Sequence, residues 1–371
     1  MKKLIALLLA LVLVLGLVAC AAKPAETTEA APGGETAAVP EDTGAKETIG
    51  ILMPTQEQTI WSIQGERLIE GFEKAGYATE IEYAEDDSAN QAMQIENMIT
   101  KGVKALVIVA VDCASLTDAC EKAKDAGILV IADDRLITNT QAVDYYVTFD
   151  LVRMGTIQGQ YIADKLDLAN QPGPFTLEIF SGSQDDTNAL SFYKGAMDVL
   201  NPYIDAGKLV IKSGQKEYAE TAIQSWDSSK AQARMDNLLS GFYTDTHLDA
   251  VLVAADCLAI GVVSSLESMG YGSADNPYPI ITGQDAELAA VKSILAGKQS
   301  MTAFLDANKL TEIMVPLVQS LLKGETVEPD TTYNNNVFDV PTKTYDPYLI
   351  DKDNVNYLVE VGFFTEAEIN G

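Results

Sequence analysis

The chain has one histidine, four cysteines and only 25 lysines and arginines among its 371 residues. The single histidine, His247, stands in a polar stretch close to Asp245, and no Cys-x-x-Cys motif occurs. A zinc site or a histidine-based catalytic triad therefore has no support in the sequence. The 54 acidic residues give a formal net charge of −29. Because phosphate contacts need clustered basic side chains, nucleic acid is not an expected partner.

Nucleotide-binding glycine motifs are also missing. Neither G-x-G-x-x-G after the first apolar run nor a G-x-x-x-x-G-K-[ST] loop is present. We therefore expect no cofactor and no metal. Cys113, Cys120 and Cys257 are expected to be small buried residues rather than disulfide partners.

The first 46 residues divide into two parts. Lys2 and Lys3 precede an apolar run from Leu4 to Val18, which is shorter than the roughly 20 residues of a spanning helix. The ending Leu17-Val18-Ala19-Cys20 resembles a bacterial lipobox, which implies a signal peptide over 1–19 and lipidation of Cys20. An ordinary signal peptide or a membrane anchor is the alternative. Residues 20–46, rich in Ala, Glu, Thr, Pro and Gly, predict a disordered tether. We expect a lipid-anchored protein on the extracytoplasmic face of the cell membrane, which is the periplasmic side in a cell with two membranes.

From residue 48 onward, short apolar runs alternate with longer amphipathic segments. This alternation, with several helices followed directly by glycine, predicts an α/β fold with parallel sheets flanked by helices. The expected strands are 48–53, 80–84, 105–111, 129–132, 145–149, 175–180, 209–212, 250–254, 280–282 and 301–304. The expected helices are 58–75, 89–101, 115–126, 152–166, 189–200, 228–241, 258–269, 286–296 and 309–323.

Polar residues recur at the carboxyl ends of these runs. Examples are Gln56, Asp112, Asp133-Asp134-Arg135, Asp256 and Gly283-Gln284-Asp285. In open parallel sheets, ligands bind outside the carboxyl ends of the strands. The pattern therefore predicts a binding cleft at this edge of the sheets.

Several motifs resemble one protein family. They are Thr48-Ile49-Gly50-Ile51, Gln94-Ile95-Glu96-Asn97-Met98-Ile99, Ala132-Asp133-Asp134-Arg135, Gly182-Ser183 with Asp185-Asp186-Thr187-Asn188-Ala189, Ala231-Gln232-Ala233-Arg234-Met235-Asp236-Asn237 and Gly283-Gln284-Asp285-Ala286. Together they are similar to the xylose-binding and multiple-monosaccharide-binding branch of the type I periplasmic binding proteins. The resemblance implies two similar lobes joined by a three-segment hinge. The expected N-terminal lobe is 47–149 plus 305–332, and the expected C-terminal lobe is 150–304 plus 333–371.

The resemblance also implies the residues that bind a sugar in the cleft between the lobes. Trp61 and Trp226, the only two tryptophans, match positions that stack on the ring. Asp134, Asp256 and Asp285 match carboxylates that accept bonds from hydroxyl groups, and Arg135 and Asn188 match donors. Gln56 and Asp112 are weaker candidates, since they can equally be turn-forming residues.

Two positions depart from the family pattern. The family usually has an arginine directly before the first stacking tryptophan, where this chain has Ile60, and a lysine where it has Leu305. If both cations are lost while the carboxylates stay, the cavity is more acidic. We therefore hypothesise a ligand with fewer hydroxyl groups on that edge, or one with its own donors.

The expected function is that of a monomeric solute-binding lipoprotein that delivers a monosaccharide of the xylose, glucose, galactose or arabinose class to an ABC permease and its ATPase subunit. We expect no enzymatic activity. One alternative keeps the fold and binds a nucleoside or a signalling furanose, or serves as a sugar sensor for a chemoreceptor or kinase. A remote alternative is a glycoside hydrolase. Its two carboxylates must flank the scissile bond, and the adjacent pairs Asp133-Asp134 and Asp185-Asp186 do not favour that arrangement.

Overall fold

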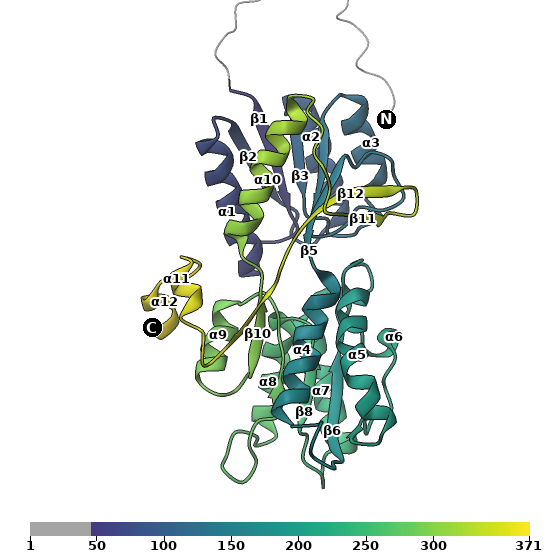
Figure 1. Cartoon of the computed structure of the whole chain (residues 1–371), viewed down its shortest axis with the longest axis vertical. Helices are drawn as coiled ribbons and strands as arrows, with labels where there is room; N and C mark the ends of the chain where they lie inside the picture. The colour runs from purple at the N-terminus through teal and green to yellow at the C-terminus, as the bar shows by residue number, and fades with distance from the viewer. Residues whose placement is uncertain (1–45) are drawn as a thin grey trace, which may run out of the picture. The chain divides into compact units, whose positions relative to one another are not determined.

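Two separate sets of strands organise the chain (Figure 1). The computed structural model describes residues 46–371, so Cys20, the expected signal peptide and all but the last residue of the expected tether lie outside the described residues. The first sheet has seven strands in the order β11-β12-β5-β4-β3-β1-β2, and all pairs are parallel except β11 with β12. The second sheet is parallel, in the order β7-β6-β8-β9. An antiparallel pair, β10 and β13, adjoins it through a bridge between Gln284 and Ala303.

The bounds of these elements follow. The strands are β1 (Thr48–Met53), β2 (Ala78–Tyr83), β3 (Ala105–Ile108), β4 (Leu129–Asp133), β5 (Tyr145–Phe149), β6 (Phe175–Phe180), β7 (Leu209–Val210), β8 (Ala250–Val253), β9 (Ile280–Ile281), β10 (Met301–Phe304), β11 (Thr331–Asn334), β12 (Asp339–Tyr345) and β13 (Tyr348–Asp351). The helices are α1 (Thr59–Lys74), α2 (Ser88–Lys101), α3 (Thr117–Asp125), α4 (Leu151–Lys165), α5 (Ala189–Asp205), α6 (Tyr218–Thr221), α7 (Ser228–Phe242), α8 (Asp256–Ser268), α9 (Leu288–Leu295), α10 (Ala307–Leu322), α11 (Tyr357–Glu360) and α12 (Glu366–Asn370), with a 3₁₀ turn at Gln224–Trp226.

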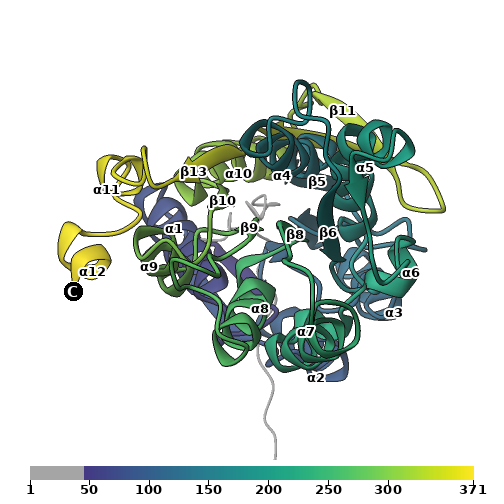
Figure 2. The same cartoon turned by 90° about the horizontal axis from the view of Figure 1, so that it is seen from below.

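Both sheets are covered by helices on both faces. Successive side chains of a strand point to opposite faces, so Val107 of β3 joins the core beneath α1 and α10, while Leu106 and Ile108 join the core beneath α2 and α3. In the second sheet, Leu252 of β8 joins the core formed with α4 and α5, and Val253 joins the core formed with α7 and α8. Figure 2 shows these two pairs of helices on opposite sides of β6 and β8. This double burial explains why central strands such as β1, β3 and β8 are apolar in continuous runs. The architecture confirms the predicted α/β class with two lobes.

The sequence pattern predicted most of the elements. The ten expected strands correspond to β1–β10, and the nine expected helices to α1–α5 and α7–α10. The pattern missed β11, β12 and β13 and the short helices α6, α11 and α12. The missed strand β11 is largely exposed, with the sequence TTYN, and carries no apolar run to mark it.

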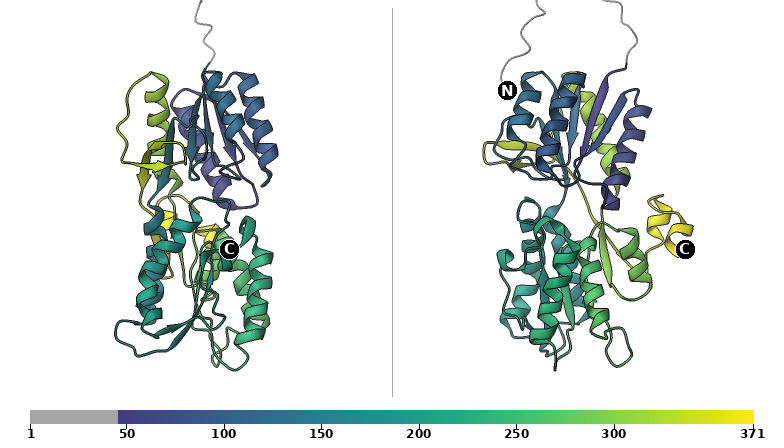
Figure 3. Two further views of the ribbon diagram at one scale, coloured as in Figure 1. Left: turned by 90° about the vertical axis from the view of Figure 1, so that its right-hand side faces the viewer. Right: turned by 180° about the vertical axis from the view of Figure 1, so that it is seen from behind.

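The chain passes between the two sets of strands three times, as seen from two further sides in Figure 3. The passages lie between β5 and α4, between β10 and α10, and between β12 and β13. The expected C-terminal lobe began its last segment at residue 333. However, β12 pairs in parallel with β5 in the first sheet, so residues 331–345 lie with the N-terminal strands and that expected boundary is corrected. Residues 46–371 form one compact unit, and none of their helices combines the length and the apolar character needed to cross a membrane.

Helices α4 and α5 pack backbone against backbone. A Cβ atom added at Gly155 of α4 would collide with the carbonyl group of Phe192, and one added at Gly195 of α5 would collide with the carbonyl group of Val152. These glycines are therefore required by close approach. The packing fixes the start of α5, which carries Asn188 and Phe192.

We expect Gly195→Ala to lower the free energy of unfolding by about 1–3 kcal/mol or more, because the new methyl group meets backbone atoms that cannot move aside. Gly241→Ala is the matched control. It lies in helix α7 with no atom within 4 Å of the added Cβ, so it should leave stability unchanged or raise it by up to about 1 kcal/mol. Urea denaturation measures both. Equal effects of the two substitutions would contradict this account of the helix pair.

Candidate functional site

A cavity lies where the carboxyl ends of both sheets meet. Its empty volume, counting the open space at its mouth, is about 340 Å³. Residues from both lobes line it: Gln58, Trp61, Asp134, Arg135, Asp186, Phe192, Trp226, Ala255, Cys257, Gln284 and Asp285. Five of the seven principal site residues predicted from the sequence are among them.

Trp61 reaches the cavity from the first turn of α1. Its indole Nε1 donates to Oε1 of Gln58 at 3.0 Å, which orients the ring, and only 5% of the residue is exposed. The guanidinium carbon of Arg135 lies 5.4 Å from the ring centroid. A cation over an aromatic face is attracted by the ring quadrupole, so the indole and the guanidinium hold each other in place.

Trp226 reaches the cavity from the second lobe by an unusual backbone turn. Ser225 and Trp226 have φ values of 61° and 52°, a left-handed backbone conformation that residues other than glycine rarely adopt. The turn is held by Ser225 N, which donates to Oγ of Ser183 at 2.7 Å. The indole ring lies against Gly182, where any Cβ would collide with it. The buried Nε1 of Trp226 has no partner among the described residues, although buried polar groups are usually paired.

Asp134 and Arg135 follow β4 directly. Asp134 has a φ of 59°, and its carbonyl oxygen accepts from the Tyr146 hydroxyl at 2.6 Å and the Thr148 hydroxyl at 3.2 Å. Arg135 donates from Nη1 to the carbonyl oxygen of Ala110 at 2.9 Å. Burial opposes the charge of Arg135, but the neighbouring carboxylates outweigh burial and raise its pKa. The guanidinium is therefore a fixed cation in the cavity wall.

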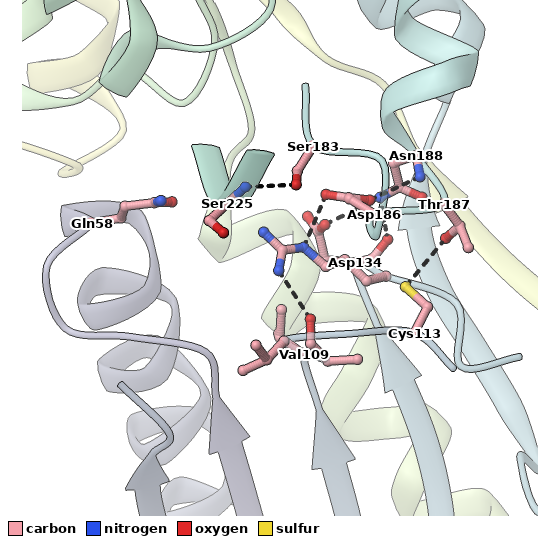
Figure 4. A network of polar contacts seen from close by, with 12 residues as sticks. Gln58, Val109, Cys113, Asp134, Ser183, Asp186, Thr187, Asn188 and Ser225 are labelled. Atoms are coloured by element: carbon pink, nitrogen blue, oxygen red, sulfur yellow. Dashed lines mark hydrogen bonds and ion pairs between the residues drawn. The ribbon is translucent and has the colours of Figure 1, made fainter. Parts of the chain in front are cut away.

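The loop before α5 brings residues of the second lobe onto this turn (Figure 4). Asn188 Nδ2 donates to the Asp134 carbonyl oxygen at 2.6 Å and to its Oδ1 at 3.2 Å. Asp186 Oδ2 lies 3.1 Å from Nε of Arg135. The two lobes are thus joined at the cavity by polar contacts that involve Asp134 and Arg135.

The carboxyl groups in this region are strongly desolvated. Burial, reinforced by Asp186 and Asp285, raises the pKa of Asp134 to about 8 despite Arg135 nearby. Burial and then Glu287 raise the pKa of Asp285 to about 7, and burial raises the pKa of Glu287 to about 7. Oε1 of the lining residue Gln284 and Oε1 of Glu287 are buried acceptors with no partner among residues 46–371. Below its raised pKa, each of these carboxyl groups is protonated and can donate one hydrogen bond as well as accept.

Four predicted residues are not part of the cavity wall: Asn188, whose side chain donates to Asp134, and Asp256, Asp112 and Gln56. Asp256 is fully buried, and its carboxylate accepts from Gln299 Nε2 at 2.7 Å, Thr302 Oγ1 at 2.8 Å and Glu287 N at 3.0 Å. It therefore supports the turn that carries Asp285. Asp112 accepts from the backbone N–H groups of Ala114 and Ser115, as a turn-forming residue does. Gln56 is exposed and does not line the cavity.

The positions that depart from the family pattern also lie apart from the cavity wall. Ile60 is packed in the core beneath α1, and Leu305 is packed near Phe149 and Met301. Their side chains carry no charge and are not among the residues that line the cavity. Arg135 is therefore the single basic residue among those that line the cavity.

Sequence reasoning missed six lining residues. Gln58, Asp186 and Gln284 could have been found, since Gln58 precedes Trp61 by one helical turn and the other two lie inside the quoted motifs. Phe192, Ala255 and Cys257 gave no signal, because small or apolar residues at a helix start read as core. Cys113, Cys120 and Cys257 are buried free thiols, and no cluster that could hold a metal ion occurs between residues 46 and 371.

The raised pKa values predict how pH affects the ligand-free protein. A carboxyl group whose pKa is raised in the folded chain binds protons more tightly there than in the unfolded chain. Its contribution to stability is present below the ordinary pKa of about 4 and is lost as pH rises toward the folded pKa. Asparagine imitates the protonated acid. We therefore expect the Tm of Asp285→Asn to exceed that of the wild type by a margin that grows between about pH 5 and about pH 8.

Asp330→Asn is the control for this pH series. Burial opposes ionisation of Asp330, but its bond to Lys343 outweighs burial and lowers the pKa, so this carboxyl is ionised across the whole window. Its Tm difference from the wild type should stay constant. Parallel pH profiles for Asp285→Asn and the wild type would contradict the desolvation of Asp285. Differential scanning fluorimetry in matched buffers measures all three proteins.

Comparisons with known proteins agree with this architecture. A family model described as a periplasmic binding protein domain matches residues 49–326. The multiple sugar-binding periplasmic receptor ChvE of Rhizobium radiobacter is 48% identical over 92% of this chain and 98% of its own length. A D-xylose-binding periplasmic protein of Haemophilus influenzae is 33% identical over 86% and 91%. A solute-binding protein of a Clostridium phytofermentans ABC transporter, solved with bound β-D-glucose, is 42% identical with a TM-score of 0.83 over 87% and 100%. The chain therefore belongs to the periplasmic binding protein family.

Proposed function

We propose that this protein is the extracytoplasmic solute-binding lipoprotein of an ABC importer and that it binds a monosaccharide in the cavity between its lobes. One observation carries the proposal. The only two tryptophans of the chain come from opposite lobes, and both line one cavity together with Asp134, Arg135 and Asp285.

This combination suits the chemistry of a sugar ring. The ring has apolar C–H faces, which an indole can cover, and a rim of hydroxyl groups, which need fixed acceptors and donors. Asp134, Asp285 and Gln284 supply acceptors, and Arg135 and the Trp226 Nε1 supply donors. A hydrogen bond to a charged partner contributes about 1.5–3 kcal/mol, against about 1 kcal/mol for a neutral one. A few such bonds in a desolvated cavity give both affinity and orientation.

The relatives support this ligand class. The ChvE relative is named for binding several sugars, the Haemophilus influenzae relative for D-xylose, and the Clostridium phytofermentans structure holds β-D-glucose. Pentoses and hexoses are therefore the expected ligands. These relatives are solute-binding proteins, and we propose that this chain likewise binds its ligand without transforming it.

We propose that the three passages between the lobes act as the hinge. With these passages as boundaries, the proposed N-terminal lobe comprises residues 47–149 plus 305–345, and the proposed C-terminal lobe comprises residues 150–304 plus 346–371. Closure of two domains around a ligand at such passages is a common switching motion. The closed form would then present the ligand to the permease and its ATPase subunit.

The proposed anchor is a lipid on Cys20, with residues 21–46 as a polar tether. We expect Cys20→Ser to abolish incorporation of an alkyne-labelled fatty acid and to move the protein from the membrane fraction to the soluble fraction. A cysteine-to-serine change at buried Cys257 is the control and should leave the label unchanged. Full labelling of Cys20→Ser would contradict the lipoprotein proposal.

The binding proposal is tested by intrinsic fluorescence, because both tryptophans of the chain line the cavity. We expect D-glucose, D-galactose, D-xylose or L-arabinose to change the emission of residues 46–371 saturably. Trp61→Phe and Trp226→Phe should each still report binding through the remaining indole. Trp61→Ala should weaken binding about tenfold or more, since it removes ring stacking and buried area.

Nucleosides serve as the second ligand class in the same assay, because paired indoles also suit a nucleobase. Saturable binding of a nucleoside with no response to any monosaccharide would contradict the sugar proposal. It would instead favour the same fold with a non-sugar ligand.

A further inference from the structure

Asp186 is the counter-ion of the cavity's one guanidinium, and it comes from the opposite lobe. It lies on the loop between β6 and α5, whereas Arg135 follows β4 of the first sheet. Their Oδ2 and Nε atoms are 3.1 Å apart, and their side chains are only 5% and 8% exposed. The second oxygen of Asp186 accepts from the backbone N–H of Asn188 at 2.8 Å, which fixes the carboxylate on its own lobe (Figure 4).

This pair depends on the closed arrangement of the lobes. When the lobes separate, water solvates both charges. The direct contact between Asp186 and Arg135 is therefore an interaction of the closed state. Removing one partner of a buried pair leaves an uncompensated charge, which costs far more than the net contribution of the intact pair. If the closed state becomes less populated, the observed affinity for the ligand falls in proportion to the fraction of the protein that is closed.

The pair also sets the charge that a ligand meets. Without Asp186, the guanidinium of Arg135 would face the cavity with its charge uncompensated and with donors free for an anionic group. With Asp186 in place, that charge is cancelled. The remaining lining acids, Asp134 and Asp285, supply no positive charge that would attract an anionic ligand.

Resting on the proposed sugar-binding function, we propose that Asp186 is a positioning and specificity-determining residue. By pairing with Arg135 across the cleft, it stabilises the closed lobes and makes the cavity select neutral sugars over acidic ones. Its role is exerted through Arg135, which Asp186 holds near the face of Trp61.

The test compares D-glucose with D-glucuronate, which differ by a carboxylate at C6. Dissociation constants are measured by tryptophan fluorescence on residues 46–371, which form a compact unit. The wild type should bind D-glucose at least tenfold more tightly than D-glucuronate. Asp186→Asn should weaken D-glucose binding at least tenfold and should shift the ratio of the two affinities at least tenfold toward D-glucuronate. Any cost that the substitution adds to lobe closure affects both ligands equally and cancels in this ratio. The ratio therefore reports the effect of the uncompensated charge of Arg135.

Asp185→Asn is the matched control. It removes the same charge from the neighbouring residue, whose carboxylate accepts from Gln224 and does not line the cavity. Both affinities should stay within about twofold of the wild type. Asp186→Glu keeps the charge and should retain the wild-type preference for D-glucose. In the Arg135→Gln background, Asp186→Asn should no longer change the ratio.

An unchanged ratio in a folded Asp186→Asn variant would overturn the inference, as would an equal change in Asp185→Asn. Circular dichroism and Tm establish that the variant is folded, and an Asp186→Glu variant that behaves like Asp186→Asn would also overturn it. A wild type that binds neither sugar nor any other monosaccharide would refute the proposed function itself, and this inference would fall with it.

Discussion

The polar groups that line the cavity are largely removed from water, and those without a partner in their own lobe must find one in the opposite lobe or in a ligand. Asp134 meets Asn188, and Arg135 meets Asp186, so part of this requirement is fulfilled by contacts between the lobes. Trp226 Nε1 and Gln284 Oε1 have no partner among residues 46–371. Because an unpaired buried polar group costs about 1–3 kcal/mol, the remaining groups favour a ligand that carries both donors and acceptors. A monosaccharide has both on a compact ring.

The fold supplies this arrangement through the ends of its strands. Parallel strands end at the same edge of a sheet, and the helices that follow them begin there, so short loops at that edge carry the polar residues. Several of these residues adopt left-handed backbone conformations, including Asp134, Trp226 and Asp285. Strained conformations of this kind persist where the surrounding structure enforces them, and they are common in binding sites. Here the bonds to Asp134 from Tyr146 and Thr148, and the bond from Ser225 to Ser183, enforce the geometry.

Much of the fold could be predicted from the sequence because both sheets are buried on both faces. Continuous apolar runs marked central strands such as β1, β3 and β8, and glycines marked several helix ends. The pattern failed for β11, β12 and β13, because β11 and β13 are largely exposed and β12, with the sequence DVPTKTY, has no apolar run. This failure moved the expected lobe boundary. The placement of residues 331–345 depends on the pairing of β12 with β5, which leaves no trace in local sequence.

The site was predictable where chemistry is visible in the residue type. Trp61, Asp134, Arg135, Trp226 and Asp285 were identified and lie together, whereas Phe192 and Cys257 resemble core residues and were not. Asp256 was predicted to bind the ligand but is not among the lining residues. A carboxylate at a strand end can stabilise a turn instead of binding a ligand. The three bonds of Asp256 to Gln299, Thr302 and Glu287 depend on tertiary structure alone.

The most direct test of the account is a crystal structure of residues 46–371 with the monosaccharide that changes the fluorescence most. The account predicts a sugar ring between the indoles of Trp61 and Trp226, with hydroxyl groups within hydrogen-bond distance of Asp134, Arg135 and Asp285. Electron density for the sugar outside this cavity, or a sugar in the cavity that contacts neither indole, would contradict it.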